Sequence, residues 1–143
     1  MTPARAMGQS MIFEQALLFG MGVTIFIVCY AVFNIYEDHF SHIALIDQLD
    51  EIRGWVGANT VKFVGKNPDG DGWISFAIPK RAGGQPYYIT FSGNGVNITA
   101  KLTGDYSWSP VFGLNDTYTM SGMANSNTGK CLIYKTGDKL IIQ

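Results

Sequence analysis

A nearly unbroken apolar run at residues 16–35 is the feature that most constrains this chain. A helix needs roughly 20 apolar residues to cross the hydrocarbon core of a bilayer, and this run is long enough. Thr24, Cys29 and Tyr30 are mild exceptions within it. A secretory signal peptide is the alternative, but its apolar core usually stops at about 7–15 residues, before a small-residue cleavage site. Because the run leads instead into Glu37 and Asp38, we expect a transmembrane helix at residues 16–36.

The charges around the run predict its orientation. Arg5 precedes it, and no Lys or Arg follows it before Arg53. The positive-inside rule therefore places the N-terminus in the cytoplasm and the remainder outside. Glu14 lies just before the run, and an ionisable group at such a place suggests function because its burial in lipid is costly. Alternatively, its carboxylate lies at headgroup level, where it suits the positive end of the helix dipole.

The helix is predicted to continue past the membrane as an amphipathic segment, residues 37–56. Apolar residues recur there every three positions and alternate with acidic and amide side chains, which is a helical pattern. The stripe comprises Phe40, Ile43, Ile46, Leu49 and Ile52, widened by Leu45 and Val56. Gly54 and Gly57 are expected to end the helix.

Residues 57–143 are predicted to form a β domain. From residue 61 onward the apolar pattern changes to period two, as in 74–78, 87–91 and 96–102. The segments 92–95 and 136–139 contain Asn, Asp and Gly and are typical of hairpin turns. The expected fold is therefore α+β, with a long N-terminal helix followed by a small antiparallel β-sandwich or barrel-like domain.

Composition argues against several functions. Ten basic and eleven acidic residues give a net charge of -1, and no basic run could follow a nucleic-acid backbone. The two cysteines offer no disulfide framework. We find no Gly-rich phosphate loop, nucleophile elbow or paired carboxylates, so we expect neither an enzyme nor a bound cofactor.

Two sequence patterns indicate modification or ion binding. The sequons beginning at Asn97 and Asn115 are candidate glycosylation sites, and Asn97 should point away from the face that carries Val96 and Ile98. Asn67, Asp69 and Asp71 match the start of a calcium loop, with glycine at its sixth position. The twelfth position lacks the bidentate Glu of such loops, and an Asp-Gly-rich turn explains the same residues without a metal.

Other side chains could form a binding site. His39 and His42 could share a helix face, but two imidazoles alone are a weak metal signal, and a wet interface outside the membrane explains them better. Several aromatic residues of the β region could line a sugar or protein surface, although packing is the commoner role. These residues are Tyr87, Tyr88, Tyr106, Trp108 and Tyr118.

The N-terminus resembles a known family. A short polar leader ending in Gly8, then Gln9 and Ser10, then Glu14 and a long apolar helix is similar to the class III signal peptides of archaeal type IV pilin-like proteins. In that family the carboxylate is commonly the fifth mature residue, whereas Glu14 would be the sixth. The β region is also similar, more weakly, to the β domains of archaeal pilin-like and archaellum accessory proteins.

The resemblance implies a leader at residues 1–8 that a prepilin-type peptidase removes between Gly8 and Gln9. It implies that Glu14 pairs with a neighbour's terminal amine during assembly, with Leu17 and Leu18 beside it. The expected protein is then a structural subunit of a type IV pilus-like surface filament, embedded in membrane lipid before it assembles with further copies of itself. Two alternatives stay open: a membrane-anchored archaellum accessory or stator protein in contact with the surface layer, and an anchored extracytoplasmic binding module.

Overall fold

The computed structural model of the protein describes residues 4–93, 95–111, 113–114 and 116–143, with side chains from residue 11 onward. A single helix, α1 (Ala4–Lys66), precedes seven strands and a short 3-10 helix. The strands are β1 (Gly72–Ala77), β2 (Tyr87–Ser92), β3 (Gly95–Ala100), β4 (Tyr106–Pro110), β5 (Thr119–Asn125), β6 (Lys130–Thr136) and β7 (Lys139–Ile142), with η1 (Ser126–Thr128) before β6. The chain divides into two compact units, Met1–Phe40 and Ser41–Gln143, and we describe each by itself.

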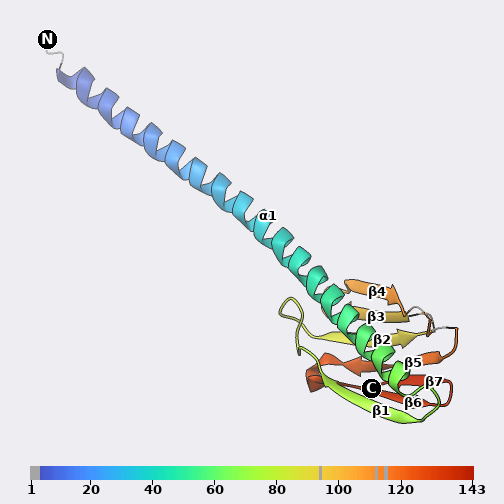
Figure 1. Ribbon diagram of the computed structural model, residues 1–143. Coiled ribbons are helices and arrows are strands. Elements are labelled where there is room, and N and C mark those ends of the chain that lie inside the picture. The colour runs from blue at the N-terminus through green and yellow to red at the C-terminus, as the bar shows by residue number, and fades with distance from the viewer. Residues whose placement is uncertain (1–3, 94, 112, 115) are drawn as a thin grey trace. The chain divides into compact units, whose positions relative to one another are not determined.

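The second unit confirms the predicted α+β class. Its strands form a single seven-stranded sheet in the order β1-β6-β7-β5-β2-β3-β4 (Figure 1). Neighbouring strands are antiparallel except β5 and β7, which run parallel. They do so because β7 folds back antiparallel to β6 and lies between β6 and β5. One sheet therefore replaces the two sheets of a sandwich.

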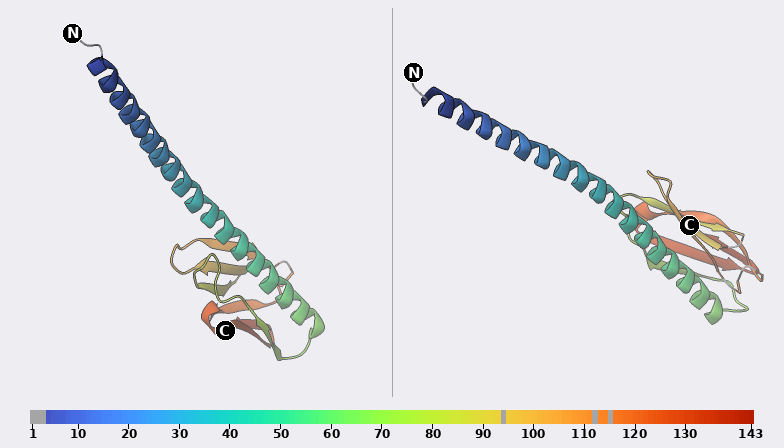
Figure 2. Two further views of the ribbon diagram at one scale, coloured as in Figure 1. Left: turned by 90° about the vertical axis from the view of Figure 1, so that its left-hand side faces the viewer. Right: turned by 90° about the horizontal axis from the view of Figure 1, so that it is seen from above.

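The part of α1 that follows residue 41 lies along one face of this sheet and forms the second layer of the unit (Figure 2). Alternate residues of the strands point toward the helix and are buried, which we call the inner face. The helix contributes Leu45, Leu49, Ile52, Val56 and Phe63, and the sheet contributes Tyr87, Ile89, Phe91, Val96, Ile98, Met120, Ala124, Cys131, Ile133, Leu140 and Ile142. Burial of each large apolar side chain stabilises the unit by about 1.5–3 kcal/mol.

The buried stripe of α1 differs from the predicted one. Leu45, Leu49, Ile52 and Val56 are buried, whereas Phe40 is 65% exposed and Ile43 is 42% exposed. A helix has 3.6 residues per turn, so positions every three residues drift steadily around it, and only spacings that mix three and four keep to one face.

The prediction that α1 ends near Gly54 and Gly57 is wrong, because the helix continues to Lys66. Thr60, Phe63 and Val64 are buried after these glycines, so packing against the sheet outweighs the low helix propensity of glycine. Both glycines line a cleft of about 280 Å³ between α1 and the β3–β4 hairpin.

Replacing Gly54 or Gly57 by Ala should stabilise the second unit by about 0.5–1 kcal/mol each, because alanine restricts the unfolded chain. A methyl group at either position meets no atom within 4 Å. Urea unfolding of the detergent-solubilised chain, followed by tryptophan fluorescence, measures the change. The matched control, Gly83→Ala, should destabilise, because Gly83 has φ +54° and its added Cβ would lie 2.9 Å from Leu45. Destabilisation by all three substitutions would contradict the prediction.

Both predicted hairpins are confirmed. β2 pairs with β3 across 92–95, where Asn94 lies outside the described residues, and β6 pairs with β7 across 136–139. β4 and β5 were not predicted. Gly122 of β5 has φ +103°, and a Cβ at this position would overlap the carbonyl oxygen of Ile142. By simple alternation along β5, Ser121 and Met123 lie on one side of the sheet, while Met120 and Ala124 lie in the core.

Candidate functional site

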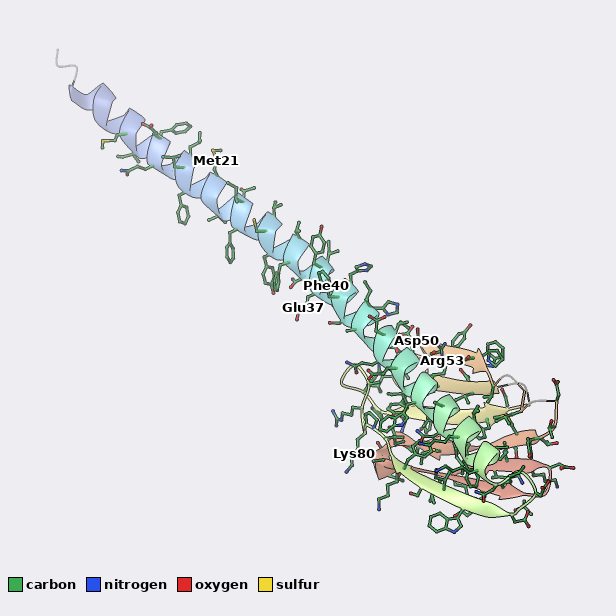
Figure 3. The ribbon with its side chains drawn as sticks, in the orientation of Figure 1. Met21, Glu37, Phe40, Asp50, Arg53 and Lys80 are labelled. Carbon is green, nitrogen blue, oxygen red and sulfur yellow. The ribbon has the colours of Figure 1, made fainter. Side chains whose placement is uncertain are left out.

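The first unit is an isolated helical segment with apolar side chains all around it. Every described residue from Met11 to Phe40 is exposed, and the large apolar side chains among them are 42–74% exposed (Figure 3). Figure 3 shows such side chains projecting from every side of this segment, Met21 and Phe40 among them. A helix that is apolar all round needs apolar surroundings, and burial of each large side chain is worth about 1.5–3 kcal/mol.

This helix is long and apolar enough to cross a membrane, and none of its most apolar stretch is buried within the protein. Its few polar groups suit such surroundings. The Thr24 hydroxyl donates a hydrogen bond to the Gly20 carbonyl oxygen at 2.8 Å. In lipid a hydroxyl without a partner would cost free energy, and this bond removes that cost.

The predicted assembly residues all lie on α1. Gly8 and Gln9 are part of its N-terminal region, and their side chains lie outside the described residues. Glu14, Leu17 and Leu18 are exposed. Because residues three and four apart share a helix face, the carboxylate and the two leucines form one continuous strip. A partner that contacts this strip meets one negative charge beside apolar surface.

The candidate histidines do not form a metal site. Among the described residues no group of three or more His, Cys, Asp and Glu side chains is placed to hold a metal ion. His39 is exposed on the first unit. In the second unit, Nδ1 of His42 lies 3.5 Å from Oδ2 of Asp105, which is in the turn before β4. His42 therefore forms a partly exposed contact between α1 and the turn before β4.

Further polar contacts hold α1 to the edge strand β4. Arg53 donates a hydrogen bond to the Trp108 carbonyl oxygen at 3.0 Å and lies 3.2 Å from the Asp50 carboxylate. Asp50 in turn accepts a hydrogen bond from the Ser107 hydroxyl. Figure 3 shows Asp50 and Arg53 on the part of α1 beside β4.

The candidate calcium loop is organised around an internal cation. The Lys135 ammonium donates hydrogen bonds to the carbonyl oxygens of Pro68 at 2.9 Å and Gly70 at 2.8 Å. It also lies 5.5 Å from the centre of the Tyr118 ring, and Lys135 is only 3% exposed. Asp71 accepts a hydrogen bond from the backbone N–H of Gly137 at 2.7 Å. The loop thus binds the protein's own ammonium group with oxygens of the kind that calcium would require.

Sequence reasoning missed Lys135, although a signal was present. Cys131, Ile133 and Lys135 alternate along β6, so Lys135 occupies a core position by parity. A lysine in a core position is rarely tolerated unless its ammonium is paired. Its partners come from a loop far away in the sequence, which the pattern alone could not identify.

The aromatic residues proposed for binding divide between the two faces of the sheet. Tyr87 is completely buried on the inner face, and Tyr118 packs against Lys135. Tyr88, Tyr106 and Trp108 point to the opposite side, which we call the outer face. Among the described residues of the second unit, no helix or strand covers the outer face (Figure 2). Sequence reasoning missed three further exposed side chains of this face, Trp73, Met123 and Tyr134.

The two sequons differ in what the structure describes. Asn97 lies on the outer face and is half-buried, opposite the buried Val96 and Ile98 as predicted. Its Nδ2 donates a long hydrogen bond of 3.4 Å to the Thr99 hydroxyl, and its Oδ1 has no hydrogen-bond partner. Asn115 lies outside the described residues.

The thiol of Cys131 is buried and has a raised pKa. Burial raises the pKa of Cys131 to about 12, and burial together with the nearby Cys131 also raises the pKa of Tyr87. The thiol therefore stays protonated and unreactive at neutral pH. The exposed Cys29, in the apolar segment, lies in the other unit.

The second unit should lose stability in alkali. Cys131 has a higher pKa in the folded protein than in the unfolded chain. Its contribution to stability is fully present below the unfolded pKa and disappears as the pH rises toward 12. From pH 9 to 12 the loss from Cys131 is on the order of 3–4 kcal/mol. Thermal unfolding across this range measures it, and Cys131→Ala should flatten the decline. A decline of equal steepness in the variant would contradict the assignment.

In comparisons with known proteins, no family model, no curated protein and no solved structure matches this chain.

Proposed function

We propose that the protein is a structural subunit of a type IV pilus-like surface filament and assembles through its N-terminal apolar helix. The observation that carries this proposal is the exposure of 42–74% of each large apolar side chain from Met11 to Phe40. Such a surface requires lipid or other copies around it. The second unit has a complete core of its own, so it does not need the apolar segment in order to fold.

The proposed order of events is the one that the resemblance of the N-terminus to class III signal peptides implies. Before assembly the segment lies in the membrane, with the N-terminus in the cytoplasm and the β domain outside. A prepilin-type peptidase then removes residues 1–8 and leaves an amine on Gln9. In the filament, apolar helices of neighbouring copies replace lipid, and Glu14 pairs with a neighbour's amine. An unpaired carboxylate among apolar helices would cost several kcal/mol, so this pairing selects the correct register.

Shearing of host cells tests the proposal. Antibody against the β domain should label fibres in the sheared fraction under the electron microscope. If the protein instead stays with the membrane after shearing, as a monomer or dimer, the archaellum-accessory alternative replaces the filament.

We further expect glycosylation of at least one of Asn97 and Asn115, because the proposed orientation places both outside the cell. Peptide mass spectrometry of protein purified from its host should find sugar on one of them, and substitution of that Asn by Gln should remove it. Unmodified peptides at both positions would contradict the expectation.

The outer face favours a second candidate function. Exposed aromatic side chains on an uncovered sheet are typical of a recognition surface. An anchored extracytoplasmic binding module is therefore the alternative, and the two roles are compatible in one subunit.

A further inference from the structure

One half of the outer face has a regular arrangement of side chains. The strand registers align them in two rows that cross β5, β2, β3 and β4. The first row is Asn125, Tyr88, Thr99 and Tyr106, and the second is Met123, Thr90, Asn97 and Trp108. We call these eight side chains the platform. Adjacent strands are about 4.8 Å apart, so each row extends across about 14 Å.

The aromatic residues of the platform are accessible. Tyr106 is 67% exposed and Trp108 is 46% exposed, and both lie on the edge strand β4. Tyr88 is half-buried, with the Lys101 ammonium 5.7 Å from the centre of its ring. The two residues on β4 therefore offer open ring surfaces, while the Lys101 ammonium lies over the ring of Tyr88.

The centre of the platform is polar. Thr90, Asn97 and Thr99 lie on the two inner strands of the platform: Thr90 shares β2 with Tyr88, and Asn97 and Thr99 lie on β3, between β2 and the β4 aromatics. The Asn97 side-chain oxygen is itself buried and has no hydrogen-bond partner, so the polar atoms of Asn97 that face a ligand are those of its amide nitrogen. The seven strands contain no Asp or Glu, and the carboxylates of this unit lie on α1 and in turns.

This arrangement is the reverse of a protein–protein interface. Such interfaces bury aromatic anchors at the centre and place polar groups at the rim. Here hydroxyl and amide groups make up three of the four central side chains, and the most exposed aromatic rings lie at one edge, on β4. A sugar ring matches this arrangement, because its C–H faces pack on aromatic rings while its hydroxyls exchange hydrogen bonds with Thr and Asn. The absence of carboxylates and the presence of Lys101 are compatible with neutral or weakly acidic sugars.

We propose that the platform binds an extended polysaccharide chain that is not part of the protein. Trp108 and Tyr106 stack on sugar rings, and Thr90, Asn97 and Thr99 bond to their hydroxyls. This inference deepens the binding-module alternative and holds whether or not the protein forms filaments.

Affinity electrophoresis of the full detergent-solubilised chain tests the proposal. The chain is produced in a host without N-glycosylation, so Asn97 is unmodified. Native gels contain hydroxyethyl cellulose, a mannan or a galactan as the probe. We expect at least one of these polysaccharides to retard the protein. Trp108→Ala should weaken that binding about tenfold or more, because loss of one buried aromatic anchor costs upwards of 1.4 kcal/mol.

Trp55→Ala is the matched control. Trp55 is 48% exposed, nearly as much as Trp108, but it lies on α1 and not on the outer face. Its substitution should leave retardation unchanged. Tyr106→Ala provides a second variant in case Trp108→Ala does not fold, as judged by circular dichroism.

Three results would overturn the proposal. The first is that none of the polysaccharides retards the protein. If the host protein also carries sugar on Asn97, the platform would instead be assigned to the chain's own glycan. Retardation that neither Trp108→Ala nor Tyr106→Ala weakens would place binding elsewhere. Dissociation of an oligomer by Trp108→Ala, seen in sedimentation, would make the outer face a contact between copies.

Discussion

Lys135→Met should lower the free energy of unfolding of the second unit by about 2–4 kcal/mol, because it removes two charge-assisted hydrogen bonds and a cation–π contact. These bonds join β6 to the loop between α1 and β1, so their loss should release that loop as well. Methionine keeps the length and volume of the side chain, which makes loss of charge the main change. Urea unfolding followed by tryptophan fluorescence measures the effect.

Lys130→Met is the control for this prediction, because Lys130 is exposed at the start of the same strand. Its substitution should change stability by less than about 0.5 kcal/mol. If both variants unfold alike, Lys135 does not hold the loop. Since Lys135 binds two carbonyl oxygens of this loop and Asp71 accepts a hydrogen bond from Gly137, neither added calcium nor a chelator should alter the unfolding midpoint.

Glu14→Gln should abolish filament assembly while leaving the unfolding of the second unit unchanged. The proposed pair with the terminal amine of a neighbour is surrounded by apolar helices, and removal of one partner from a buried ion pair costs about 3–5 kcal/mol. The yield of sheared fibres should therefore fall by about a hundredfold or more. Quantitative immunoblots of sheared and membrane fractions measure the ratio.

Glu51→Gln is the matched control, since Glu51 is an exposed carboxylate of the same helix within the second unit. It should assemble like the natural protein. Normal fibre yield from Glu14→Gln would mean that Glu14 lies at headgroup level and has no part in assembly.

Much of the fold could be predicted because its signals are local. Strict alternation in β1, β2 and β3 identified both the strands and their faces, and Asn97 was assigned correctly to the side opposite Ile98. β4 and β5 were not predicted. In β4 the small Ser107 faces the core and the aromatic residues face outward, and in β5 serine and glycine interrupt the apolar pattern. The end of α1 was misplaced because glycine propensity is local, whereas the burial of Phe63 depends on the distant sheet.

The candidate sites also divide into those that local spacing identifies and those that depend on contacts between distant residues. The strip of Glu14, Leu17 and Leu18 is visible in sequence because helical spacing alone brings its members together. The Lys135 site was not, because Pro68 and Gly70 meet its ammonium only after β6 has paired with β1. The platform likewise depends on strand register: Tyr88 and Tyr106 share a row only because β3 lies between their strands.

The first residue of the protein in sheared, high-mass material from its host tests the central claim most directly. We expect fibres whose subunits begin at Gln9, as found by N-terminal sequencing of the same fraction that is seen in the electron microscope. A chain that begins at Met1 and remains in the membrane fraction as a monomer would contradict it.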